Sequence, residues 1–203
     1  MVDNMKRVLV IFLFCAATLL SGAQEKKVDH SFQLGGGYYF RTLKYSKART
    51  EAEGVAVQFS YGADFLLGKS WSVMPSIGIS SVIETASPKM GGTTDRSSDI
   101  EFAVLARYRF AKRCIAGLGP MLSYSFDGTD YPVSIDDGGR RGRTRIYTPF
   151  SLSVKPQFAV DLGKHWRVGA ESAIGLSNTY RDSGNTGISS HLYYFLATVG
   201  FHF

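Results

Sequence analysis

The feature that most limits what this chain can fold into is an alternation of period two that recurs in eight segments. In the last segment, 191–203, every second residue from Tyr193 onwards is apolar or aromatic, and the intervening residues become small or polar towards the end. Such alternation places apolar side chains on one face of a β-strand. The other segments are 30–42, 55–65, 71–80, 100–110, 114–126, 150–162 and 166–177. The sequence therefore predicts an all-β protein of eight strands.

The connections between these segments alternate in length. The short ones are Gly68-Lys69-Ser70, Ala111-Lys112-Arg113 and Gly163-Lys164-His165, and the long polar ones are 43–54, 84–99, 127–146 and 178–190. Short turns at one end and long loops at the other are typical of an antiparallel up-and-down transmembrane β-barrel. The first strand should start, and the last should stop, at the short-turn end, with the last strand closing the barrel against the first.

A seven-residue repeat supports this arrangement. Leu-Gly-Lys-Ser-Trp-Ser-Val at 67–73 recurs as Leu-Gly-Lys-His-Trp-Arg-Val at 162–168, four strands later. Both copies should therefore lie at the same end of the barrel. Each places a tryptophan, Trp71 or Trp166, at the start of a strand, where a membrane interface favours its amphipathic ring.

The size of the residues predicts which face is outside. An eight-stranded barrel has an interior just wide enough for side chains to fill. The set rich in Gly, Ser and Ala fits that space, whereas the bulky apolar set would overfill it, so we expect the bulky set to face lipid. Three prolines, Pro75, Pro120 and Pro156, fall on the outward parity. Each lacks the amide hydrogen that would bond to a neighbouring strand, which predicts bulges or local breaks there.

The N-terminus indicates export. Lys6 and Arg7 precede an apolar run from Val8 to Leu20 and the small residues Ser21-Gly22-Ala23. This pattern predicts a signal peptide over 1–23, cleaved after Ala23, and a barrel domain over 24–203. The predicted mature chain retains one cysteine, Cys114, so no intrachain disulfide is expected. The formal net charge of the full chain, +6, suits contact with anionic lipid or sugar phosphates, and we expect no nucleic-acid partner.

The small inward-facing set also contains charges. These are Arg41, Asp64, Glu101, Arg107, Arg109, Lys155, Asp161, Arg167 and Glu171. An unpaired charge in a narrow interior is expensive, so we expect opposite charges to pair. The sequence thus predicts a paired network that closes a polar interior.

The signal peptide, the rhythm of strands and loops, and the aromatic last strand together resemble the small bacterial outer-membrane β-barrels. The resemblance is greatest to the eight-stranded OmpA/OmpX-like barrels and to the outer-membrane β-barrel domain of Bacteroidetes. In that family the last strand carries a signal read by the barrel-assembly machinery, which the resemblance assigns here to Phe195, Val199, Phe201 and Phe203. The glycine lies at Gly200, whereas the usual pattern would have it nearer Thr198.

The longest predicted loop, 127–146, carries four acidic residues followed by a cluster of arginines: Arg140, Arg141, Arg143 and Arg145. Guanidinium groups bind phosphates in bidentate fashion. The cluster therefore suggests contact with lipopolysaccharide phosphates; the alternative is a solvated loop whose charges cancel.

The sequence contains no metal-ligand spacing, phosphate-binding loop or nucleophile motif, so we expect no catalytic, cofactor or metal site. We expect a monomeric outer-membrane protein with a structural or interaction role: membrane integrity, adhesion or partner binding. One alternative is a lipid A-modifying enzyme, for which His191 beside Ser189 and Ser190 is the candidate, although Tyr193 stands where the deacylases have their serine. The others are a small porin-like channel and a soluble lipocalin-like binder.

Overall fold

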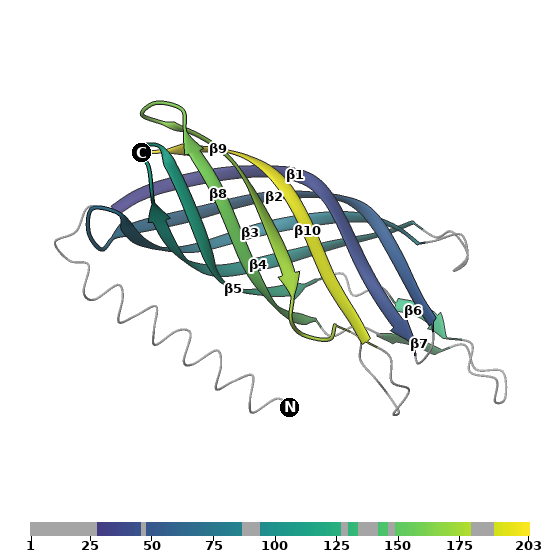
Figure 1. The fold of residues 1–203 in the computed structure, drawn as a ribbon. Helices are drawn as coiled ribbons and strands as arrows, with labels where there is room; N and C mark the ends of the chain where they lie inside the picture. Colours follow the sequence, from purple (N-terminus) through teal and green to yellow (C-terminus); the bar gives the residue numbers. More distant parts are fainter. Residues whose placement is uncertain are drawn as a thin grey trace.

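The computed structural model describes residues 28–45, 48–86, 94–126, 130–133, 142–145, 149–179 and 189–203. Eight long strands form one closed, all-antiparallel barrel (Figure 1), which confirms the predicted fold class. They are β1 (Val28–Tyr45), β2 (Ala48–Leu66), β3 (Trp71–Ala86), β4 (Thr94–Arg109), β5 (Cys114–Ser125), β8 (Phe150–Asp161), β9 (Trp166–Gly175) and β10 (Ser189–His202). Among the described residues, no helix is long and apolar enough to cross a membrane.

The strands follow one another around the barrel, and β10 closes it by pairing with β1. The pairing runs without interruption from Ser31 opposite His202 to Lys44 opposite Ser189. Phe203 continues it, because its amide donates to the His30 carbonyl (2.9 Å) and the His30 amide donates to the Phe203 carbonyl (3.1 Å). The predicted closure of the last strand against the first is confirmed.

The short connections have the predicted positions, but the long ones needed correction. The strands β1 and β2 pair as far as Tyr45 and Ala48, so the expected loop over 43–54 is largely strand. Similarly, β3 continues to Ala86 and β4 starts at Thr94. The polar composition of these segments indicated loops, but strands that extend beyond a membrane can be polar on both faces.

A second correction concerns the longest loop. Within 127–146, the short strands β6 (Asp130–Val133) and β7 (Gly142–Arg145) form a separate two-stranded sheet. This hairpin lies at the end of the barrel opposite to the C-terminus (Figure 1). With four residues in each strand, it is too short for a period-two pattern to be recognised.

The three prolines cause local breaks but no bulges. Pro75 faces a gap in the pairing with β2, Pro120 a gap in the pairing with β4, and Pro156 a gap in the pairing with β9. In each case the register is the same on both sides of the gap, so no residue is inserted. Because proline has no amide hydrogen, it interrupts the pairing with the neighbouring strand on one side. It does not change which side chains face inwards.

Glycine is required at Gly37, where β1 approaches β10 closely. A Cβ atom built on Gly37 would overlap the carbonyl oxygen of Phe195 on β10. A side chain at this position would push apart the two strands that close the barrel.

The outer face carries the bulky apolar side chains, as residue size predicted. Large hydrophobic residues at 36–60% exposure occur on every strand of the barrel, among them Leu34, Phe59, Ile77, Phe102, Leu118, Phe158, Val168 and Phe195. A soluble monomer rarely exposes a contiguous apolar surface of more than a few hundred Å². A continuous apolar belt around a closed barrel is the surface expected of a protein surrounded by lipid.

The predicted signal peptide, 1–23, lies outside the described residues, so its cleavage after Ala23 stays a prediction.

Candidate functional site

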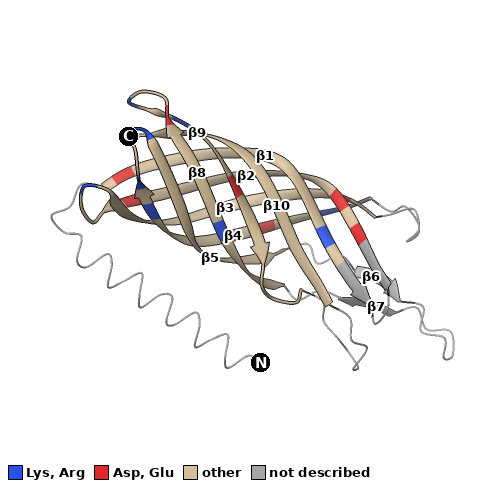
Figure 2. Ribbon diagram, viewed as in Figure 1, with Lys and Arg blue, Asp and Glu red and all other residues tan. Residues whose placement is uncertain are grey.

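The barrel interior is the candidate site, because it contains most of the charged residues that the sequence singled out. The structure places all nine predicted inward charges on the inner face. Figure 2 shows the charged residues in colour on the strands. They lie in several groups between the short-turn end and the long-loop end of the barrel.

The group nearest the short turns is centred on Asp161. Its Oδ2 lies 2.7 Å from Nη1 of Arg109, and its Oδ1 lies 2.6 Å from Nε of Arg167. The ring nitrogen Nε2 of His202 is 3.9 Å from Oδ1. Because two guanidinium groups hold one carboxylate, the loss of either would leave Asp161 with a partner.

The next group is a single, deeply buried ion pair. Nη1 of Arg107 lies 2.7 Å from Oδ2 of Asp64 and 3.0 Å from the sulfur of Met74. The Arg107 side chain is 1% exposed, and no second carboxylate contacts it within the described interior. Each member of this ion pair therefore has one ionic partner among the described residues, whereas Asp161 has two.

A mixed amide and ion-pair group joins β1, β8 and β9. Nζ of Lys155 lies 2.7 Å from Oε1 of Glu171. Gln33 donates to the other oxygen, Oε2, at 2.7 Å, and Gln157 donates to Gln33 Oε1 at 3.3 Å. Neutral amides thus extend the network across the barrel without adding charge.

Glu101 has its partners among neutral groups. It accepts hydrogen bonds from the Gln58 amide and from the Tyr194 hydroxyl, the latter at 3.1 Å. The Tyr194 hydroxyl also lies 3.3 Å from the sulfur of Met121. This group joins β2, β4 and β10, strands that are far apart in the sequence.

The group towards the long-loop end pairs Arg41 with Glu84, at 3.4 Å between Nη1 and Oε2. The Arg41 guanidinium also lies 5.8 Å from the ring centroid of Tyr39, within the range of a cation–π contact. Each of the five predicted inward cations therefore has a carboxylate within 3.4 Å.

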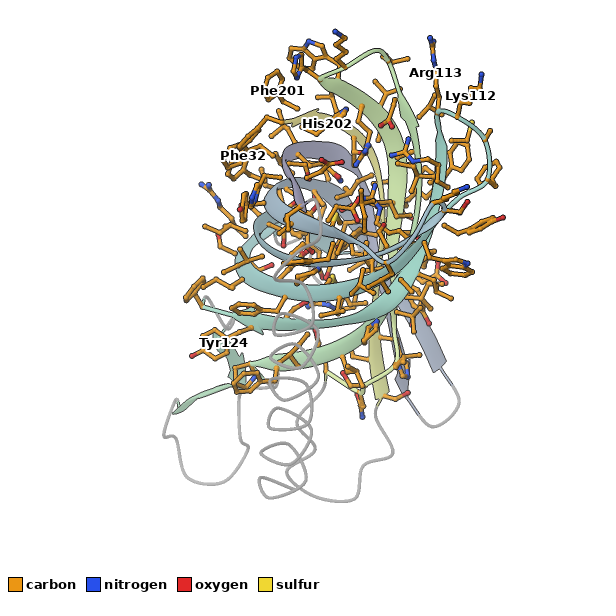
Figure 3. All side chains as sticks on the ribbon, turned by 90° about the vertical axis from the view of Figure 1, so that its left-hand side faces the viewer. Phe32, Lys112, Arg113, Tyr124, Phe201 and His202 are labelled. Carbon is orange, nitrogen blue, oxygen red and sulfur yellow. The ribbon has the colours of Figure 1, made fainter. Side chains whose placement is uncertain are left out.

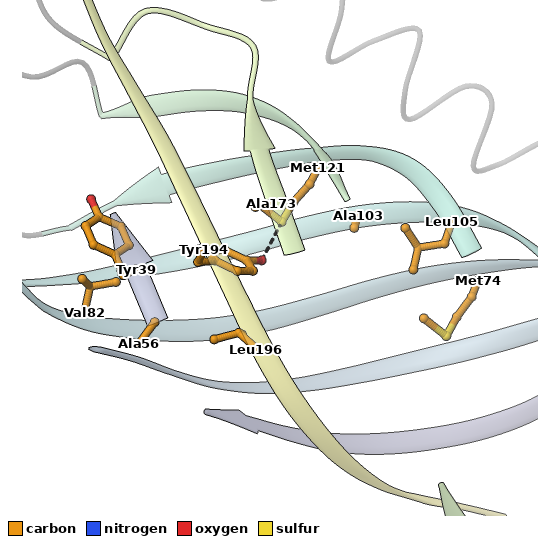
Figure 4. Close-up of a cluster of buried hydrophobic side chains, with 10 residues drawn as sticks. All are labelled: Tyr39, Ala56, Met74, Val82, Ala103, Leu105, Met121, Ala173, Tyr194 and Leu196. Atoms are coloured by element: carbon orange, nitrogen blue, oxygen red, sulfur yellow. Dashed lines mark hydrogen bonds between the residues drawn. The ribbon is translucent and has the colours of Figure 1, made fainter. Parts of the chain in front are cut away.

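Apolar side chains pack between these groups, although polar and charged residues outnumber hydrophobic ones among the buried side chains, as expected of a polar interior. Figure 4 shows the cluster, whose ten buried members come from every barrel strand except β8: Tyr39, Ala56, Met74, Val82, Ala103, Leu105, Met121, Ala173, Tyr194 and Leu196. All ten residues have the inward parity of their strands.

The low exposure of the inner side chains indicates a closed interior. Tyr39, Leu105 and Leu196 are 0% exposed, and Arg107 and Met121 are 1% exposed. A side chain that lined a water-filled channel would have accessible surface towards that channel. The described interior is therefore packed at these levels rather than open.

Sequence reasoning missed several members of the network. Glu84 and Asp99 were assigned to a loop, although the inward parity of β3 and β4 continues to them, and Glu84 pairs with Arg41. The glutamines Gln33, Gln58 and Gln157 lie on inward parity but were not singled out because they carry no charge. The sequence signal that could have identified them is a glutamine at an inward position of a strand that also carries inward charges.

The aromatic residues at the short-turn end form a belt around the rim. Trp71 packs on Tyr108 with ring centroids 4.8 Å apart, and Trp166 packs on Phe201 at 5.5 Å. Both tryptophans are more than half exposed. Of the predicted assembly signal, Phe195, Val199, Phe201 and Phe203 all lie on the outer face, and their recognition by assembly machinery stays a prediction.

The structure separates His191 from Ser190. It is adjacent to Ser190 on β10, so the two side chains point to opposite faces of the sheet. The Ser190 hydroxyl lies 3.0 Å from the Thr179 hydroxyl instead. In the described part of the chain, no hydrogen bond joins His191 to a serine or to an acid. The same residues contain no group of His, Cys, Asp or Glu side chains that could hold a metal ion.

A closed eight-stranded barrel with an apolar exterior and a packed, charged interior defines the class of small outer-membrane β-barrels. No protein-family model matches the chain, and no curated protein sequence matches it.

Solved structures of this class are similar to it. The chain superimposes on Neisserial surface protein A (NspA) with a TM-score of 0.53 and 13% identity, covering 84% of this chain and 96% of NspA. The attachment invasion locus protein Ail of Yersinia pestis gives a TM-score of 0.45 and 11% identity over 87% of this chain and 99% of Ail. OprG of Pseudomonas aeruginosa gives 0.40 and 11% over 88% and 97%. The likeness to NspA shows a shared fold and, at this identity, nothing further.

Proposed function

We propose that this protein is an outer-membrane barrel whose interior is closed and whose role is structural or interaction-based, through its long-loop end. The observation that supports it best is the packing of the interior, in which each predicted cation has a carboxylate partner and buried apolar side chains fill the space between. A channel for solutes would need a continuous polar path. A catalyst would need a nucleophile and a base in contact.

The proposal predicts that the reconstituted protein does not conduct ions through a stable pore. Planar bilayers that contain the purified protein should show no long-lived single-channel steps, because the inner side chains leave no continuous water path. A shift in gel mobility on heating, measured on the same sample, would show that the barrel was folded. Stable, large single-channel currents from such a sample would contradict a closed interior and favour the porin-like alternative.

The long-loop end is the proposed interaction surface, and lipopolysaccharide phosphate is its proposed ligand. Arg143 and Arg145 belong to β7, in the hairpin that extends from this end. Arg140 and Arg141 lie outside the described residues. Charge-assisted hydrogen bonds from several guanidinium groups would recognise phosphates that project from the membrane surface.

Changing Arg140 and Arg141 to Ala should therefore weaken lipopolysaccharide binding several-fold and reduce its dependence on salt. Binding can be measured by titrating lipopolysaccharide onto the detergent-solubilised protein at low and high ionic strength. A matched variant, Asp136→Ala/Asp137→Ala, changes two acidic residues of the same loop and should not weaken binding. Equal binding by all three proteins would show that the arginine cluster is a solvated loop.

A further inference from the structure

The three short turns share one backbone design. In each turn the amide of the first residue donates to the carbonyl four residues later: Leu67 to Trp71 at 2.9 Å, Phe110 to Cys114 at 3.2 Å, and Leu162 to Trp166 at 2.7 Å. Each turn has the order apolar, small, lysine, polar, apolar or sulfur-containing. The shared hydrogen bond therefore places a lysine at the same point of every turn.

The flanks of these turns are apolar and exposed. Leu67, Phe110 and Leu162 are 46%, 52% and 55% exposed, and Trp71 and Trp166 are exposed beside them. Lys69, Lys112 and Lys164 are also exposed, as is Arg113. In Figure 3, Lys112 and Arg113 lie at the same end as Phe201 and His202, whereas Tyr124 lies towards the other end. The short-turn rim thus combines lysines at its tips with large apolar groups directly below them.

These cations have no carboxylate partners among the described residues. Of the described acids at this end, Asp161 is bound by Arg109 and Arg167, and Asp64 is bound by Arg107. Asp29 on β1 is the remaining one, against four exposed cations in the turns. The described turns, 67–70, 110–113 and 162–165, contain no acidic residue. The rim therefore presents a net positive charge to its surroundings.

We propose that this short-turn rim binds the anionic headgroups of phospholipids in the leaflet that surrounds it. The inference rests on the proposed membrane location. A lysine held just beyond a ring of interfacial aromatic residues lies at the depth of the lipid phosphates, and its apolar neighbours keep it there. Each basic residue near an anionic lipid surface gains electrostatic attraction that salt screens. Three turns with the same design would gather anionic lipid around this end of the barrel.

Intrinsic tryptophan fluorescence can test this proposal. Its two tryptophans, Trp71 and Trp166, both lie at these turns. The purified protein is reconstituted into phosphatidylcholine vesicles that contain a small, fixed fraction of brominated lipid. The brominated lipid is either phosphatidylcholine or phosphatidylglycerol, and bromine quenches tryptophan fluorescence only at short range. At low salt, we expect brominated phosphatidylglycerol to quench about two- to fourfold more than brominated phosphatidylcholine.

That excess should disappear in ~1 M salt, where charges are screened beyond ~3 Å, and in the variant Lys69→Gln/Lys112→Gln/Lys164→Gln. A control variant, Arg141→Gln/Arg143→Gln/Arg145→Gln, removes equal charge from the longest loop and should keep the excess. Equal quenching by the two lipids would overturn the proposal. The lysines would then contact either an acidic soluble partner or solvent. An excess that survives the lysine changes would also overturn it. Quenching by neither lipid would instead contradict the membrane location itself, so the two failures are distinguishable.

Discussion

Changing Arg107 to Leu should lower the free energy of unfolding by about 3–5 kcal/mol, the cost of leaving one member of a buried ion pair without its partner. Arg107 is 1% exposed and lies 2.7 Å from Asp64, whose carboxylate would remain buried. The measurement is urea-induced unfolding of the protein from lipid vesicles, followed by tryptophan fluorescence.

Two further variants test the cause of this loss. Arg109→Leu removes the same type of charge, but its side chain is 31% exposed and its partner, Asp161, keeps Arg167. It should cost about 1 kcal/mol or less. The double variant Asp64→Leu/Arg107→Leu removes both charges and should recover at least half of the stability lost in Arg107→Leu. Equal losses for Arg107→Leu and Arg109→Leu would contradict the description of the Arg107 pair as isolated and buried.

Changing Ile77 to Arg should cost about 2–4 kcal/mol, because a charge near the middle of the lipid-facing surface must be moved out of water into hydrocarbon. Ile77 lies near the middle of β3 and is 44% exposed on the outer face. The same unfolding measurement from vesicles determines this cost.

Leu176→Arg is the matched control. Leu176 is also exposed, at 55%, but it lies immediately after β9 at the long-loop end. The cost there should be about 0–1 kcal/mol, since a side chain at the interface can reach water. If Ile77→Arg were as mild as Leu176→Arg, the outer face would be in contact with water, and the soluble lipocalin-like alternative would gain support.

The number of strands in the barrel, their order and the face of each strand could be predicted from local pattern, but the short strands β6 and β7 could not. The alternation in Phe102, Val104 and Ala106 is a property of one strand, because successive side chains in extended backbone point to opposite sides whatever their surroundings. Loop boundaries were harder to predict. The first residues of β4, 94–99, are polar on both faces, as a strand that leaves the membrane can be, so they resembled a loop.

The interior could be predicted only in part, since its contacts join strands that are distant in the sequence. Inward parity identified Asp64, Arg107 and Glu101, but the choice of partner depends on the register and tilt with which the barrel closes. Arg107 and Asp64 are 43 residues apart, and Tyr194 and Glu101 are 93 apart. A pattern within one strand cannot predict which residues of distant strands will pair.

The last strand shows both what local pattern predicts and what depends on closure of the barrel. By itself, the sequence determined that Tyr193, Phe195, Phe201 and Phe203 share one face and that the strand ends at the short turns, because both follow from period two and from an even number of strands. Only the tertiary structure decided that Phe203 pairs with His30, that Tyr194 reaches Glu101, and that apolar side chains such as Leu196 fill the interior. These contacts exist because a closed barrel brings each inner face opposite the others, and closure is a property of the whole chain.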